Sequence, residues 1–194
     1  MIVKLTQNPL SSRVCSRPQQ PGGQSPDLGP SYRLTFSVYI NSFDGRNLRL
    51  GKWAELLRVT RTNNNCCAIG DRIPAIFTNK GGFIQVGTQI GAAGNKWKNV
   101  NMNEKTWYKL DIIQYQWNNK VGKRICVLAS SNFSVMFQYY FELRLDGVRK
   151  WRLENRNPRS FSNVKVWAAR CRHGFPPANA YIDNLQYEFI GKLH

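Results

Sequence analysis

Acidic residues and histidines are scarce in this chain of 194 residues, and both shortages narrow its chemistry. Only 11 aspartates and glutamates stand against 28 lysines and arginines, and the 2 histidines are His173 and the terminal His194. The sequence has no Cys-x-x-Cys pair, so its cysteines and histidines do not form a zinc module. It also has no Gly-x-Ser-x-Gly elbow, which removes the nucleophile of the α/β-hydrolase type.

Long apolar runs are absent too. No stretch is long and apolar enough to cross a bilayer as a helix, so we expect no membrane span. The opening residues Met1 to Thr6 lead directly into polar Gln7 and Asn8, and they do not form the apolar core of a signal peptide. If the protein works outside the cell, we therefore expect its leader to be missing from this chain.

The chain is rich in positive charge and in aromatic rings. Its formal net charge is +17, and aromatic residues make up 12% of it. A field of this size attracts polyanions such as nucleic acids, anionic lipids and sulfated or carboxylated glycans. The aromatic residues alternate as core residues, so we expect no exposed stacking platform, and the pattern argues against a nucleic-acid partner.

The pattern of apolar residues predicts one all-β domain over residues 32–191, preceded by a flexible lead-in over residues 1–31. The lead-in is rich in proline and glycine and cannot bury enough apolar surface to offset the cost of ordering. From residue 34 to residue 40 apolar and polar side chains alternate, which is typical of a half-buried strand. Similar segments recur along the chain, and no window keeps a helical period. Residues 79–82 and the pair Asp146-Gly147 supply the glycines that tight hairpin turns need.

The last two apolar segments, residues 161–169 and 180–188, alternate in the same way. In the second segment Tyr181 and Leu185 fall on one face of a regular strand, because residues four apart point to the same side. Such a pair of closing segments is typical of a β-sandwich, in which the last strands complete the two sheets.

Five cysteines, Cys15, Cys66, Cys67, Cys126 and Cys171, leave one thiol over if the others pair. Cys66 and Cys67 are the disulfide candidates. Sequence neighbours cannot easily close on each other, so each of the two would need a distant partner. A secreted protein with disulfides and a fully reduced cytosolic protein both stay open at this point.

Several of these segments also resemble a known family. The block Gly70-Asp-Arg-Ile-Pro74, Trp107 at the head of a strand, residues 161–167 and the run Tyr181-Ile-Asp-Asn-Leu185 are similar to concanavalin A-like or laminin G-like jelly-roll domains of secreted marine-invertebrate proteins. The resemblance implies a two-sheet antiparallel jelly-roll sandwich in a secreted, extracellular protein. Residues 121–137 depart from the pattern, and we expect an insertion that is loosely packed or looped out, with an extra strand as the alternative.

Basic clusters supply the candidate ligand-binding residues. The planar fork of arginine donates two hydrogen bonds at once to sulfate, carboxylate or phosphate. On the segment 148–153, Lys150 and Arg152 are predicted to face solvent, while Trp151 and Leu153 face the core. Trp97 is predicted to lie in a loop and either to stack on a sugar ring or to fold back onto the core. The predicted ligand-binding residues are Arg149, Lys150, Arg152, Arg156, Lys96, Trp97 and Lys98.

Two further chemistries have weaker support. Glycoside hydrolysis needs two carboxylates in one cleft, but Arg144 separates the nearest candidates, Glu142 and Asp146, and the hairpin turn explains Asp146 better. Calcium binding would start from Asp71, but an arginine partner or a turn explains this residue better. We therefore predict no catalytic residue and no cofactor, with calcium at Asp71 as the alternative.

Charge, pattern and resemblance together predict a non-catalytic extracellular recognition module. We expect it to bind carbohydrate, with polyanionic (sulfated or carboxylated) glycans favoured. The main alternative is a structural or adhesive module of a larger extracellular protein, which would bind matrix or cell-surface proteins. A glucanase-like hydrolase is the weaker alternative.

Overall fold

The computed structural model describes residues 15–16, 31–43, 53–61, 73–89, 95–117, 138–155, 158, 164–168 and 178–190. Within these ranges every regular element is a β-strand. The strands are β1 (Cys15–Ser16), β2 (Tyr32–Ser42), β3 (Trp53–Arg61), β4 (Ala75–Asn79), β5 (Phe83–Gln89), β6 (Asn95–Asn101), β7 (Trp107–Trp117), β8 (Gln138–Leu145), β9 (Val148–Asn155), β10 (Val164–Ala168) and β11 (Asn179–Phe189).

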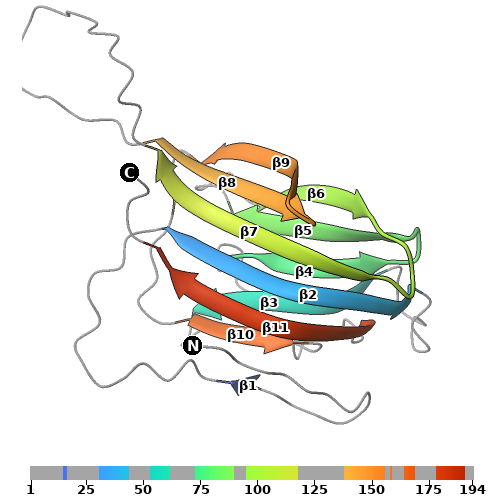
Figure 1. Cartoon of the computed structure of the whole chain (residues 1–194). Helices are drawn as coiled ribbons and strands as arrows, with labels where there is room; N and C mark the ends of the chain where they lie inside the picture. Colours follow the sequence, from blue (N-terminus) through green and yellow to red (C-terminus); the bar gives the residue numbers. More distant parts are fainter. Residues whose placement is uncertain are drawn as a thin grey trace, which may run out of the picture.

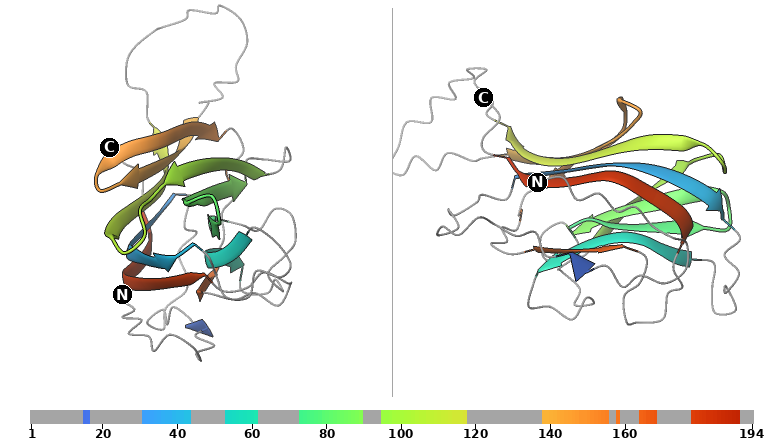
Figure 2. Two further views of the ribbon diagram at one scale, coloured as in Figure 1. Left: turned by 90° about the vertical axis from the view of Figure 1, so that its right-hand side faces the viewer. Right: turned by 60° about the horizontal axis from the view of Figure 1, so that its bottom comes forward.

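The strands form two antiparallel sheets packed face to face (Figure 1). A six-stranded sheet has the order β1-β10-β3-β4-β5-β6, and a five-stranded sheet has the order β11-β2-β7-β8-β9. The views in Figure 2 show the same two layers. The predicted all-β, two-sheet jelly-roll sandwich is confirmed, and the last two strands, β10 and β11, join one sheet each.

The core lies between the sheets and follows from the alternation seen in the sequence. Along β2 the burial pattern alternates strictly, and Leu34, Phe36, Val38 and Ile40 are each 0% exposed. Residues of one strand face point into one layer, so these side chains meet the inward residues of the six-stranded sheet. Partners from that sheet include Leu56, Leu57, Val59, Ile76, Ile84 and Val86.

Both predicted hairpins are confirmed. Gly82, in the turn between β4 and β5, has a φ angle of 79°, a conformation that glycine adopts without steric cost. In the turn between β8 and β9, Asp146 has a φ of 49° and Gly147 one of 79°. Two successive positive φ angles are the feature that lets a two-residue turn match the twist of its strands.

The predicted alternation of β11 is wrong in its second half. Tyr181 is 37% exposed, whereas Leu185 is 3% exposed and belongs to the core, so the two residues lie on opposite faces. The register with β2 shifts between Asp183 and Gln186, and Asn184 has a φ of 53°. This β-bulge adds a residue to β11 and reverses the facing of everything after it.

Two strands were not predicted. β6 lies where a loop was expected, so the prediction that Trp97 sits in a loop is wrong. Only one residue of β6, Val100, is buried, which makes the usual alternation signal weak in this polar edge strand. The two residues of β1 fall inside the predicted lead-in and pair with Val166 and Trp167 of β10.

Several predictions lie outside the described residues. They concern Cys66, Cys67, Asp71, Arg156 and the segment 121–137. A search of the described part for a helix of membrane-spanning length and hydropathy finds none.

Candidate functional site

Strand β6 is the edge of the six-stranded sheet, and β9 is the edge of the five-stranded sheet on the same side of the sandwich (Figure 1). The register of β6 with β5 places Lys96, Lys98 and Val100 on the core-bearing face, opposite Thr88, Val86 and Ile84. The alternate residues Trp97, Asn99 and Asn101 point to the outer face.

Lys98 and Lys150 come together at this edge. They line a shallow hollow of about 310 Å³ with Asn99, Val100 and Asn101. No carboxylate lines the hollow, and within the described ranges no ion pair joins either lysine to an acid. The two ammonium groups attract an anionic group by Coulomb interaction, and no protein carboxylate in the hollow competes for them. We call Lys96, Trp97, Lys98, Asn99, Asn101 and Lys150 the β6 site.

Lys150 reaches the hollow because of a bulge in β9. Trp151 pairs with Leu143 and Arg149 pairs with Arg144, so Lys150 is an extra residue without a cross-strand partner in β8. The inserted residue leaves Trp151 packed against Phe141, with ring centroids 5.4 Å apart. The bulge therefore adds a cation at the sheet edge without disturbing the packing of the core.

Trp97 lies on the outer face of the six-stranded sheet, and the expectation that it folds back onto the core is wrong. Its half-buried indole covers Gly87, where a Cβ atom would stand only 2.2 Å from a ring carbon. Phe77 flanks it, with ring centroids 5.8 Å apart. Next to it on β6, Asn99 accepts a hydrogen bond of 3.0 Å from the side-chain amide of Gln85. The outer face of β6 thus presents an aromatic ring and amides, and its other face, at the edge of the sheet, presents lysines.

Two of the arginines predicted as ligand contacts, Arg149 and Arg152, lie elsewhere. Arg149 and Arg152 are exposed on the outer face of the five-stranded sheet, away from the core-bearing face that carries Lys98. The guanidinium of Arg152 lies 4.0 Å from the ring centroid of Tyr140 and 5.6 Å from that of Trp117. These rings hold Arg152 in place by cation–π attraction. Of the predicted set, the structure brings Lys98 and Lys150 together and places Arg149 and Arg152 on another face.

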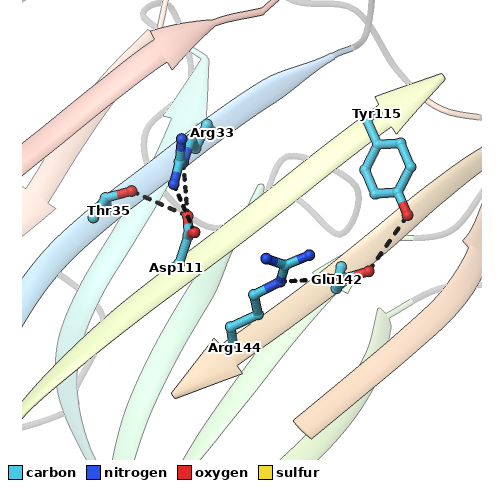
Figure 3. Close-up of polar contacts among 6 residues, drawn as sticks. All are labelled: Arg33, Thr35, Asp111, Tyr115, Glu142 and Arg144. Atoms are coloured by element: carbon cyan, nitrogen blue, oxygen red, sulfur yellow. Dashed lines mark hydrogen bonds and ion pairs between the residues drawn. The ribbon is translucent and has the colours of Figure 1, made fainter. Parts of the chain in front are cut away.

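The outer face of the five-stranded sheet also carries two carboxylates that are held by arginines (Figure 3). Asp111 accepts two hydrogen bonds from Arg33, at 2.9 and 2.8 Å, and one from Thr35 at 3.1 Å. The bidentate contact raises the pKa of the Arg33 guanidinium above its ordinary value. The alternation of β2 and β7 contains this pair, but sequence reasoning missed it because register is needed to bring the two strands into line.

Glu142, one of the two carboxylates considered for hydrolysis, accepts a hydrogen bond of 2.5 Å from Arg144 and one of 3.4 Å from the hydroxyl of Tyr115 (Figure 3). Burial, and secondarily the negative charge of Glu142, raises the pKa of Tyr115. Asp146 lies in the β8–β9 turn, where its carboxylate accepts the backbone N–H of Lys109 at 2.7 Å. The two acids thus have separate structural partners. No group of three potential metal ligands occurs within the described ranges.

The fold and this edge define the protein as a jelly-roll β-sandwich with a basic edge strand. No protein-family model matches the sequence, and no curated protein matches it.

Solved structures of similar fold include the binding domain of botulinum neurotoxin serotype G, with a TM-score of 0.49 and 10% identity over 84% of this chain. They also include the galectin LEC-6 of Caenorhabditis elegans, at 0.44 and 10% over 89%, and a sialidase, at 0.44 and 10% over 82%. The chain spans 34% of the toxin domain, 93% of the galectin and 13% of the sialidase. Similarity at this level does not extend to ligand or activity.

Proposed function

We propose that this domain is a non-catalytic, extracellular glycan-binding module whose β6 site binds the acidic groups of a polyanionic glycan. The observation that carries the proposal is the convergence of Lys98 and Lys150, from different sheets, on one hollow without a carboxylate. The net charge of +17 would speed the approach of any polyanion, and the site would then fix where it binds.

The lysines, the asparagines and Trp97 of the site would contact different parts of a glycan. The lysines attract sulfate or carboxylate groups as mobile point charges. They therefore select a ligand by its charge and not by one fixed shape. Asn99 and Asn101 offer amide donors and acceptors to hydroxyl groups beside them. The half-exposed indole of Trp97 lies on the neighbouring face of the same strand and provides an apolar surface for a sugar ring.

Heparin affinity tests the proposal, with the double variant Lys98→Ala/Lys150→Ala compared against Lys80→Ala/Lys105→Asn. Both variants lose the same charge, but Lys80 and Lys105 are exposed residues outside the β6 site, and asparagine tolerates the φ of 57° at residue 105. Each lysine near a polyanion contributes about 1 kcal/mol, so the site variant is expected to bind about thirtyfold more weakly. Equal losses in the two variants would show that binding is spread over the whole surface and would contradict a defined site.

Salt and chelator complete the test. Binding through lysines should weaken steadily as ionic strength rises from about 0.01 M to about 1 M, because salt screens exposed charges. Heparin binding that persists unchanged in concentrated salt would contradict the mechanism. A chelator should have no effect, since no carboxylate lines the hollow. A loss with chelator would favour the alternative of a calcium ion held through Asp71.

A protein-binding module of the extracellular matrix or cell surface is the second candidate. It is supported by the exposed apolar side chains of Val148, which is 57% exposed, and Trp117, which is 46% exposed. Absence of any signal on a glycan array, together with a matrix protein that binds the domain and loses affinity on Val148→Ser, would favour this candidate over glycan binding.

A further inference from the structure

The outer face of the five-stranded sheet carries an aromatic cluster whose residues do not line the hollow of the β6 site. Tyr181, Tyr39 and Trp107 occupy one line across β11, β2 and β7, where Tyr39 pairs with both neighbours in register. The ring centroid of Tyr39 is 5.4 Å from that of Trp107 and 5.9 Å from that of Tyr181. Trp107 is 51% exposed. We call these three residues the aromatic rung.

A second cluster on the same sheet provides an internal comparison. Tyr115, Trp117 and Tyr140 lie toward the other end of β7, and there Arg152 covers the ring faces of Tyr140 and Trp117. Within the described part of the chain no cation lies over a ring of the aromatic rung. One cluster is thus covered by the protein's own arginine, whereas in the other Trp107 and Tyr181 stay 51% and 37% exposed.

Polar side chains border the aromatic rung along the strand direction on both sides. On one side the next outward residues are Asp183, Ser37 and Lys109, which stand in line across the same three strands. On the other side Asn41 donates a hydrogen bond of 3.2 Å to Asn179. Successive outward residues of a strand lie about 7 Å apart, so these polar groups are within reach of a molecule seated on the rings.

We propose that the aromatic rung binds a neutral sugar chain, as a second site that is independent of the β6 site. A pyranose has a face of C–H groups, which suits the negative face of an aromatic ring. Its rim of hydroxyl groups both donates and accepts hydrogen bonds, and the residues that border the rung can do both: Asp183 offers a carboxylate and Lys109 an ammonium, with amides on the opposite side. The carboxylate and the ammonium stand in one row on either side of Ser37, so this border carries no net charge, which favours a neutral ligand over a polyanion.

The tilt of the rings narrows the class of ligand further. The planes of Tyr39 and Trp107 meet at 48°, and those of Tyr39 and Tyr181 meet at 56°. The flat surface of a crystalline polysaccharide contacts several rings at once only if the rings are coplanar. Tilted rings instead fit the successive sugar units of a single twisted chain. Three strands span about 10 Å between the outer two, so the rung has the length of about two sugar units.

The experiment compares Trp107→Ala with Trp117→Ala, two exposed tryptophans at opposite ends of β7. The probes are soluble neutral oligosaccharides of glucose, galactose, mannose and N-acetylglucosamine, titrated by calorimetry and tryptophan fluorescence. We expect at least one of these probes to bind the native domain. Its affinity should fall about tenfold in Trp107→Ala, the loss expected for one stacked ring, and should stay unchanged in Trp117→Ala.

Lys98→Ala/Lys150→Ala separates this inference from the proposed function, since it should lower heparin affinity and leave the neutral probe unaffected. Thermal melting of Trp107→Ala shows whether this variant is still folded. The variant Trp107→Phe is a second control, because phenylalanine keeps a ring and should retain part of the affinity. Absence of binding by every neutral probe would overturn the inference. So would equal losses in the two tryptophan variants, or a shift from dimer to monomer on Trp107→Ala, which would identify the rung as a contact between copies.

Discussion

The ion pairs on the outer faces of the two sheets differ in how far they are exposed to solvent. On the six-stranded sheet Arg58 and Glu55 form an ion pair of 2.9 Å in which the two side chains are only 1% and 0% exposed. On the five-stranded sheet the pair of Arg33 and Asp111 is 43% and 12% exposed. The first face is buried along β3 and β4, whereas the arginine of each pair on the second face stays exposed, Arg33 to 43% and Arg144 to 44%. Burial therefore assigns the β3–β4 part of the first face to stability and leaves the exposed β6 edge and the second face for recognition.

The largest expected effect is the loss of the buried ion pair. Arg58→Ala leaves the Glu55 carboxylate buried without its arginine and removes a cation–π contact, 5.5 Å long, with the ring of Phe77. We expect a loss of about 3–5 kcal/mol in the free energy of unfolding, measured in urea. The double variant Arg58→Met/Glu55→Leu should recover much of it, because it removes both charges. A loss no larger than that of Arg33→Ala would erase the contrast between the two faces.

A smaller effect is expected where Trp97 covers Gly87 on the six-stranded sheet. In Gly87→Ala the new methyl group cannot coexist with the indole, so Trp97 must move or the strands must separate. Overpacking of this kind costs about 1–3 kcal/mol. The double variant Gly87→Ala/Trp97→Ala should be more stable than Gly87→Ala alone. If the two substitutions are simply additive in urea unfolding, the indole does not occupy the place assigned to it.

The third effect concerns the interior between the two faces. Tyr32 and Tyr187 stack with ring centroids 5.6 Å apart, and burial raises the pKa of both hydroxyls well above the ordinary value. A raised folded-state pKa means that the unfolded chain loses its protons first as the pH increases. Stability is therefore complete below about pH 10 and falls above it, by about 1.4 kcal/mol per pH unit for each tyrosine.

Unfolding free energies measured on both sides of about pH 10 check this. Tyr32→Phe/Tyr187→Phe should fall less steeply than the native domain, while Tyr181→Phe on the outer face should follow the native curve. Identical slopes in all three proteins would exclude the buried pair as the origin of alkaline instability.

The smallest effect is expected for the open pair on the five-stranded sheet. Asp111→Asn keeps the shape of the side chain and removes its charge, so the bidentate contact with Arg33 loses its ionic part. Because the Arg33 side of the pair is 43% exposed, we expect a loss of about 0.2–1 kcal/mol that diminishes as salt is added. A loss as large as that of Arg58→Ala would mean that exposure does not distinguish the two pairs.

Alternation and glycine turns were enough to predict the two-sheet architecture, because burial on one face of a strand leaves a direct trace in the sequence. The bulge in β11 was not predictable, since Asn184 adopts its positive φ only in the context of the partner strand. β6 was missed for a related reason. As an edge strand it buries only Val100. Its two faces carry mostly polar residues, so the sequence lacks the apolar–polar alternation that predicts a strand.

The candidate site was only partly predictable. The sequence identifies Lys98 and Lys150 as basic residues, but it does not reveal that they share a hollow, because that depends on which strands become the sheet edges. Arg152 looked equally suitable until the structure placed it on the rings of Tyr140 and Trp117. The aromatic rung requires the register of three strands, and no local pattern contains that information.

The extra residue of β9 separates the charge of this edge from the packing of the core. Because Lys150 stands outside the paired ladder, we expect substitutions there to leave Trp151 packed against Phe141. A library randomised at residue 150 would therefore be a practical route to altered binding.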